Sequence, residues 1–159
     1  MKNHPETIVG HIHLTVSDLD RALTFYRDLL GFEVSARYGD SAVFLSAGGY
    51  HHHIGLNTWS GKNATPAPEG HTGMYHVAFL YPNRKELARV LKHIIESGYP
   101  IDGAADHGVS EAVYLRDPDN NGVEIYVDRP KDTWKVSNDG MVEMVTEHLD
   151  FESLLKELE

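Results

Sequence analysis

The feature that most constrains the fold is an internal repeat. Near the start of each half of the chain, a strand-like segment leads into an amphipathic helix that a glycine ends. His11 lies 20 residues before Gly31, and His76 lies 22 residues before Gly98. A chain that repeats one supersecondary unit at nearly the same spacing is expected to build two similar modules. The two histidines then occupy matching positions.

The first module, residues 7–57, is expected to run β-α-β-β-β. β-branched residues predict a strand over Ile8–Val16, and Ser17 is the expected N-cap of the helix that follows. Glycine-rich turns separate three further strand-like segments. These lie near Phe32–Ala36, Ser41–Ser46 and Tyr50–Asn57.

The same order returns in the second module, residues 74–128, after a linker over residues 58–73 that is rich in Gly, Pro and Ser. We expect a strand at Tyr75–Tyr81 and a helix at Asn83–Ser97. Shorter strands are expected near Tyr99–Asp102, Glu111–Arg116 and Gly122–Asp128. A tail over residues 129–159 contains the strand-like MVEMV and ends in an amphipathic helical segment, Asp150–Leu158.

These elements predict an α+β fold in which two tandem βαβββ modules form an open eight-stranded cup with the helices outside. The chain of 159 residues is long enough for one good core and short for two independent ones. We therefore expect a single domain over residues 1–159.

Composition narrows the function. The formal charge is −10, with 14 basic residues scattered among 24 acidic ones, which argues against nucleic acid as a partner. The N-terminus and the rest of the chain have no apolar run of the length that a signal peptide or a membrane span needs, so a cytoplasmic location without membrane contact is expected. Cysteine is absent, so any metal must bind to nitrogen and oxygen.

His11, His76 and Glu124 are the candidate metal ligands. A single histidine at the start of a strand is more often a surface residue, but the repeat pairs these two. Glu124 lies within the β-branched segment GVEIYV, where a carboxylate must be exposed or paired. A divalent metal held by two imidazoles and one carboxylate would keep one face open for substrate and dioxygen.

Two stretches resemble a known family. GHIHLTVSDLDRALTFYRDLLGFEV resembles the opening module of the vicinal oxygen chelate superfamily, which includes glyoxalases, bleomycin-resistance proteins and dioxygenases. DHGVSEAVYLRDPDNNGVEIYVDRP resembles the closing stretch of its type I extradiol, catechol 2,3-cleaving dioxygenases. The resemblance covers residues 8–130. It implies that His11, His76 and Glu124 form a facial triad that binds Fe(II), or more rarely Mn(II).

The resemblance also implies roles for residues that do not bind the metal. His52 matches the family's acid-base residue, and His107 and Tyr114 match residues that hydrogen-bond the substrate oxygens. Tyr114 lies ten residues before Glu124, and the tight turn PDNNG is expected to make their two strands antiparallel neighbours. Strand alternation places His51 and His53 on the face opposite His52. Which of the three faces the metal is left open.

Gly55 stands where glyoxalase-type members carry a second metal-binding carboxylate, so the resemblance favours three protein ligands and oxygenation. Because Gly55 shares its parity with His51 and His53, Gly55 and His52 can both face the metal only if the strand contains a bulge. The expected activity is cleavage of a catechol-like aromatic diol with O2, in aromatic catabolism.

Two alternatives remain from the sequence. One is a non-oxidative, metal-dependent isomerase, lyase or transferase of the same superfamily, and the other is a protein that sequesters a small molecule. Many catechol dioxygenases of this type have two such domains, whereas this chain resembles the metal-bearing one alone. A homodimer could supply what the second domain supplies there. Whether the loop over residues 58–72 closes over substrate is also open.

Overall fold

The computed structural model describes residues 1–68 and 70–159. The chain divides into two compact units, Met1–Ala67 and Pro68–Glu159. The division falls inside the linker predicted over residues 58–73.

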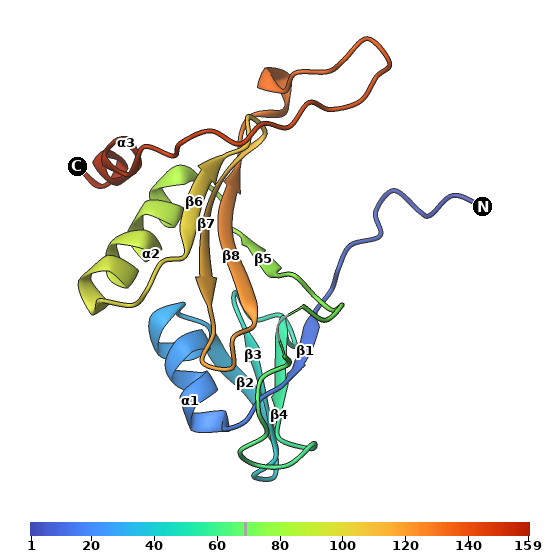
Figure 1. Cartoon of the computed structure of the whole chain (residues 1–159), viewed down its shortest axis with the longest axis vertical. Helices are drawn as coiled ribbons and strands as arrows, with labels where there is room; N and C mark the ends of the chain where they lie inside the picture. Colours follow the sequence, from blue (N-terminus) through green and yellow to red (C-terminus); the bar gives the residue numbers. More distant parts are fainter. Residues whose placement is uncertain (69) are drawn as a thin grey trace. The chain divides into compact units, whose positions relative to one another are not determined.

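The first unit carries one four-stranded sheet and one helix that changes from α to π geometry along its length (Figure 1). The helix consists of α1 (Leu19–Leu23) and a π-helical continuation, η1 (Thr24–Leu29). The sheet order is β1-β4-β3-β2, with β1 and β4 parallel and the other pairs antiparallel. Its strands are β1 (Ile12–Thr15), β2 (Glu33–Tyr38), β3 (Ala42–Ser46) and β4 (Ile54–Asn57).

The second unit repeats this topology, with the sheet order β5-β8-β7-β6 and a parallel β5–β8 pair. Its strands are β5 (Val77–Leu80), β6 (Gly103–Asp106), β7 (Ser110–Arg116) and β8 (Gly122–Asp128), and its main helix is α2 (Arg84–Ser97). Short helical segments follow: η2 (Lys131–Thr133), α3 (Phe151–Leu155) and η3 (Lys156–Leu158).

The shared strand order confirms two tandem βαβββ modules and the α+β class. Each described sheet is open and has four strands. The joining of the two sheets into one cup, and the single-domain organisation, stay predictions.

Several strand boundaries were predicted wrongly: the strand expected at Tyr75–Tyr81 runs only over Val77–Leu80, and three others differ more. The first strand begins at Ile12 rather than Ile8, and β4 begins at Ile54 rather than Tyr50. The strand expected near Tyr99–Asp102 is absent at those residues, because β6 runs from Gly103 to Asp106. Tyr99 instead donates its hydroxyl hydrogen bond to the carbonyl oxygen of Arg116, at 2.8 Å. Residue preferences for β-structure identified the apolar segments, but they do not show which residues find a hydrogen-bonding partner on the neighbouring strand.

The helix start was also one residue off. Asp18, not Ser17, is the N-cap, and its carboxylate accepts a hydrogen bond from the Arg21 amide at 2.8 Å. Ser17 accepts from the Arg21 guanidinium at 3.2 Å. Both residue types cap helices well, so sequence preference alone does not separate them.

Helix α2 follows its sequence signals. The Asn83 side chain accepts from the Glu86 amide at 2.9 Å, and Gly98 ends the helix in the left-handed conformation, with φ of 69°. One face is fully buried, at Leu87, Leu91 and Ile94. In Figure 1 this helix lies along its own sheet, and it packs against β8 and α3.

Nowhere in residues 1–68 and 70–159 does a helix combine the length and the apolar character that crossing a bilayer requires.

A buried ionic cluster ties the end of β8 to β6 and β7. Glu111 is 4% exposed and accepts from Arg84 at 2.7 Å and from Arg129 at 3.0 Å. Arg129 also pairs with Asp106. The hydrogen bond from Arg129 holds the pKa of Asp106 below its ordinary value.

Replacing Arg129 by Met should remove one partner from each of two carboxylates. We expect the free energy of unfolding near pH 7 to fall by about 1.5–3 kcal/mol. Because the pKa of Asp106 is lower in the folded protein, its contribution is present above about pH 4 and disappears as the pH falls through the folded pKa. Urea unfolding at several pH values should therefore show a smaller acid-induced loss in Arg129→Met than in wild type.

Lys131→Met is the matched control, because it removes a positive charge from an exposed residue of the same segment. An equal loss of stability in both variants would show that the cluster contributes nothing specific.

Candidate functional site

Three of the predicted site residues share one face of the second sheet. Glu124 on β8 lies directly opposite Tyr114 on β7 and Ala78 on β5. His76 immediately precedes β5, and its contact with Glu124 places its side chain on that face too. The prediction that Tyr114 lies beside Glu124 on an antiparallel neighbour is confirmed.

His76 and Glu124 are in direct contact. The Nε2 atom of His76 lies 2.8 Å from Oε2 of Glu124, and the Glu124 side chain is 10% exposed. Burial raises the pKa of Glu124, which His76 and His107 partly oppose. Nδ1 of His76 is buried without a hydrogen-bond partner among the residues that the structure describes. A buried carboxylate of this kind is stabilised by a nearby cation.

Gly122 makes this contact possible. A Cβ atom at Gly122 would lie 2.1 Å from the carbonyl oxygen of Tyr75 and 3.0 Å from Cβ of His76. The backbone before β5 can therefore approach β8 only where β8 has no side chain. This approach places His76 two residues from Glu124 along the strand pair.

The donors fit a divalent metal. Two ligands bound at about 2.0–2.2 Å and at a right angle lie about 3 Å apart, and the His76 and Glu124 donor atoms lie 2.8 Å apart. Within each unit's described residues, no three His, Asp or Glu side chains gather as a complete metal site. The third predicted ligand, His11, belongs to the first unit. The three-residue set therefore stays a prediction.

His107 and Tyr114 form a second pair on this unit. Nε2 of His107 lies 2.6 Å from the Tyr114 hydroxyl, and Nδ1 lies 2.7 Å from the carbonyl oxygen of Val145. Burial, followed by the charge of Glu124, raises the pKa of Tyr114, so the phenol stays protonated near neutral pH. Sequence reasoning named this histidine and this tyrosine but missed Val145, because a main-chain acceptor has no residue-type signal.

The first sheet carries the equivalent row with different chemistry. There Gly55 on β4 lies opposite His13 on β1 and Phe44 on β3. The two sheets have the same strand order, and Gly55 pairs with the second residue of β1 as Glu124 pairs with the second residue of β5. Gly55 is therefore the position equivalent to Glu124. The repeat therefore supplies a carboxylate at this position in one module and no side chain in the other.

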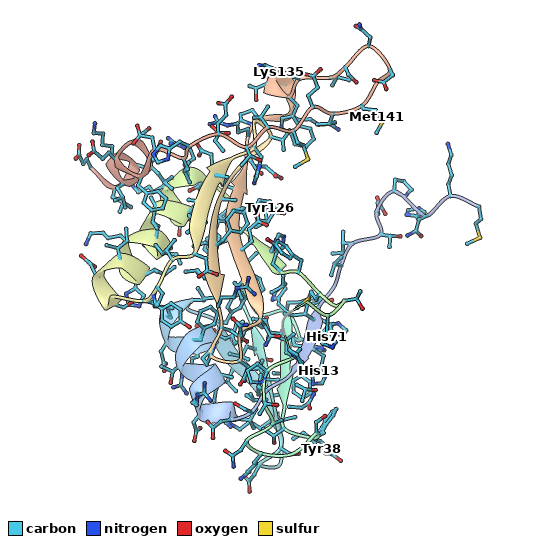
Figure 2. All side chains as sticks on the ribbon, viewed as in Figure 1. His13, Tyr38, His71, Tyr126, Lys135 and Met141 are labelled. Atoms are coloured by element: carbon cyan, nitrogen blue, oxygen red, sulfur yellow. The ribbon has the colours of Figure 1, made fainter. Side chains whose placement is uncertain are left out.

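His13 occupies the space beside Gly55. Its ring lies between Phe44 and Trp59, with centroid separations of 5.7 and 5.3 Å, and Figure 2 shows it on β1. A Cβ atom at Gly55 would lie 2.9 Å from this ring. In the second module the equivalent pair is Ala78 and Glu124. The large side chain is thus on β1 in one module and on β8 in the other.

The three consecutive histidines have different neighbours, and the Nδ1 atoms of His51 and His52 lie 2.7 Å apart. The His52 ring lies against the His11 ring in a tilted arrangement, with centroids 4.4 Å apart, and the His51 ring lies in the same way against Tyr50 at 4.0 Å. Nδ1 of His53 accepts from the Ala47 amide at 3.2 Å. Burial, reinforced by the neighbouring histidines, lowers the pKa of His52.

The parity argument about these histidines was wrong. Because β4 begins only at Ile54, the strict alternation of a strand does not extend back through His51–His53. No bulge within β4 is needed for His52 to contact His11 while Gly55 faces His13. The catalytic roles of His52, His107 and Tyr114 stay predictions.

The fold and the paired donors define a class. The chain matches the Glyoxalase/Bleomycin resistance protein/Dioxygenase superfamily over residues 8–125, and it belongs to that superfamily.

Among curated relatives, it is 43% identical over 155 residues to a catechol-2,3-dioxygenase from Bacillus subtilis (strain 168), covering 97% of this chain and 53% of that one. It is 29% identical over 121 residues to biphenyl-2,3-diol 1,2-dioxygenase 3 from Rhodococcus globerulus, covering 76% and 63%. A manganese-dependent 2,3-dihydroxybiphenyl 1,2-dioxygenase from Geobacillus genomosp. 3 is 28% identical, covering 77% and 38%. The chain thus spans about half the length of the first of these relatives.

Solved structures show the same fold. A glyoxalase/dioxygenase from Nostoc punctiforme has a TM-score of 0.67 at 21% identity, covering 82% of this chain and 98% of that one. A lactoylglutathione lyase from Agrobacterium tumefaciens has a TM-score of 0.60 at 24% identity, covering 78% and 96%. At these identities the likeness speaks for the fold alone.

Gly122→Ala should destabilise the protein by more than about 3 kcal/mol, because a backbone carbonyl cannot move away as a side chain can. Gly103→Ala is the matched control, since nothing lies within 4 Å of its added Cβ and its φ is not positive. Urea unfolding compares the two. Similar stabilities would contradict the close approach of Tyr75 to Gly122.

Gly55→Ala should behave differently, because it meets an exposed side chain. With His13 present, the clash should cancel the roughly 0.5–1 kcal/mol that Ala gains over Gly in a strand. In the His13→Ala background that gain should appear. A double-mutant cycle measured by urea unfolding should give a coupling of at least about 0.5 kcal/mol, and simple additivity would contradict the contact.

Proposed function

We propose that this protein is a metal-dependent extradiol dioxygenase that cleaves a catechol-like aromatic diol with O2. One observation carries the proposal: the His76–Glu124 donor pair shares its sheet face with Tyr114, which His107 engages. The likeness to a catechol-2,3-dioxygenase over 97% of this chain supports it.

His11, His76 and Glu124 would hold the metal. A divalent metal there supplies Lewis acidity toward the diol and electron transfer toward dioxygen. The raised pKa of Glu124 and its contact with an imidazole nitrogen support this role, because a cation would compensate both groups. Fe(II) is the proposed metal, with Mn(II) as the alternative that a manganese-dependent relative suggests.

Gly55 supports oxygenation over isomerisation. At the position that equals Glu124 by strand register, the first module has no carboxylate, and the His13 ring fills the adjoining space. Three protein ligands leave positions for both a chelating diol and dioxygen, whereas a fourth ligand suits a non-redox Lewis acid. The isomerase, lyase or transferase alternative is correspondingly weaker.

The remaining residues handle the substrate and its protons. Tyr114 and His107 would orient a diol oxygen by hydrogen bonding, and Glu124 lies directly opposite Tyr114 in the sheet. His52 would accept and return a proton, for which its lowered pKa keeps the imidazole neutral at physiological pH. We further propose a cytoplasmic homodimer as the working form.

Activity is tested by loading metal-free protein with Fe(II) or Mn(II) without oxygen and then adding catechols in air. Ring opening between a hydroxylated and a non-hydroxylated carbon should give a yellow product and consume one O2 per diol. Glu124→Gln and His76→Ala should lose at least about 100-fold in rate, since even outer-shell changes cost 10–100-fold. Glu96→Gln, on the exposed face of α2, is the control.

An oxygen-independent turnover of a glyoxalase-type substrate with Ni(II) or Zn(II), and none with catechols, would favour the isomerase class instead.

Metal binding is tested separately by thermal unfolding. Metal at about 100 times its dissociation constant should stabilise the folded protein by about 2.7 kcal/mol, and EDTA should remove the gain. Glu124→Gln should show little of this shift, while Glu96→Gln should keep it. An EDTA-insensitive melting temperature in metal-loaded wild type would contradict the metal site.

A further inference from the structure

The C-terminal arm, residues 129–149, reaches His107. Its outer part turns back on itself through the Val136–Val142 bridge, and Figure 2 shows Lys135 and Met141 in this part, away from the second sheet. Its returning part pairs with the end of β6. The Asp106 and Glu147 backbones exchange hydrogen bonds of 3.0 and 2.9 Å, and the Val145 amide donates to the carbonyl of His107 at 3.1 Å.

The arm also contacts the His107 ring. The carbonyl oxygen of Val145 lies 2.7 Å from Nδ1. A carbonyl oxygen can only accept, so the hydrogen of this bond belongs to Nδ1. Three backbone hydrogen bonds to Asp106 and His107 fix the place of that carbonyl, so the contact does not depend on a mobile side chain.

The other ring nitrogen then has a defined role. In a neutral imidazole with hydrogen on Nδ1, Nε2 is an acceptor. The Tyr114 hydroxyl, 2.6 Å away, must therefore donate to it. With its hydrogen committed to His107, the Tyr114 oxygen offers only lone pairs to a further ligand.

We propose that the C-terminal arm is a positioning element: the Val145 carbonyl fixes the His107 tautomer and thereby makes Tyr114 a hydrogen-bond acceptor for the ligand. A ligand hydroxyl, which can donate, is recognised, and an ether oxygen at the same place is not. The role of Tyr114 toward a diol substrate rests on the proposed function. The assignment of the His107 tautomer does not, because it uses only contacts within residues 106–147.

The first test reads the tautomer directly in metal-free protein. Nitrogen-15 NMR of labelled histidines, at about pH 8 where imidazole is neutral, assigns the hydrogen to Nδ1 or Nε2 of His107. Wild type should show the Nδ1–H form. Tyr114→Phe should keep it, because Val145 remains. An Nε2–H form in wild type, or loss of the Nδ1–H form in Tyr114→Phe, would overturn the proposal.

The second test releases the arm. Val145→Pro removes the backbone N–H that donates to the His107 carbonyl. It should shift the ratio of the two His107 tautomers toward the Nε2–H form by about five- to tenfold. Thr146→Pro is the matched control, because it keeps both the amide and the carbonyl of Val145. Amide exchange at Glu147 reports release of the arm, and circular dichroism reports folding. A released, folded Val145→Pro variant with an unchanged tautomer would overturn the proposal.

Selectivity gives an independent readout. Metal-loaded wild type and Thr146→Pro should bind a catechol more tightly than its monomethyl ether, and this preference should narrow by about five- to tenfold in Val145→Pro. An unchanged preference alongside a changed tautomer would overturn the role assigned to Tyr114. If catechols are neither bound nor cleaved while the tautomer results hold, the proposed function fails and the positioning by the arm stands.

Discussion

The parallel pairing of β5 with β8 is the constraint on which the candidate site depends. The backbone before β5 can approach β8 closely because Gly122 has no side chain, and this approach holds His76 beside Glu124. A buried carboxylate would otherwise be costly at a central strand. The sheet's hydrogen-bond register therefore fixes Glu124, and the close backbone approach immediately before β5 fixes His76, which favours a precise pair of metal-ligand atoms.

The two modules share one architecture but differ in the side chain at the position of the carboxylate. The same position carries Glu124 in one sheet and Gly55 in the other, and the neighbouring strand compensates in volume with Ala78 or His13. Each pair keeps one small and one large side chain, so packing is preserved while the ligand set changes. A carboxylate at Gly55 would need two changes rather than one. A single substitution at Gly55 is therefore not expected to give the first module a carboxylate ligand.

The sequence predicted the module order because periodicity and glycine ends act locally, as the full length of α2 and β8 illustrates. It predicted Tyr114 beside Glu124 because a tight turn fixes the register of the strands that it joins. It failed where a distant partner decides. β4 starts only where β3 and β1 can pair with it, so the alternation assumed for His51–His53 did not apply. The Val145 carbonyl left no trace in the sequence at all.

The C-terminal arm both covers the end of edge strand β6 and contacts the side chain of His107. β6 is an edge strand of the described second sheet, and an uncovered edge exposes backbone groups that invite pairing with other chains. The arm covers the end of that edge through Asp106 and Glu147, while the ionic cluster with Arg129 fixes the arm's root. His107 is the next residue after β6. The backbone pairing that protects the edge therefore also brings the Val145 carbonyl to the imidazole, so the same contacts serve the sheet's edge and the His107 tautomer.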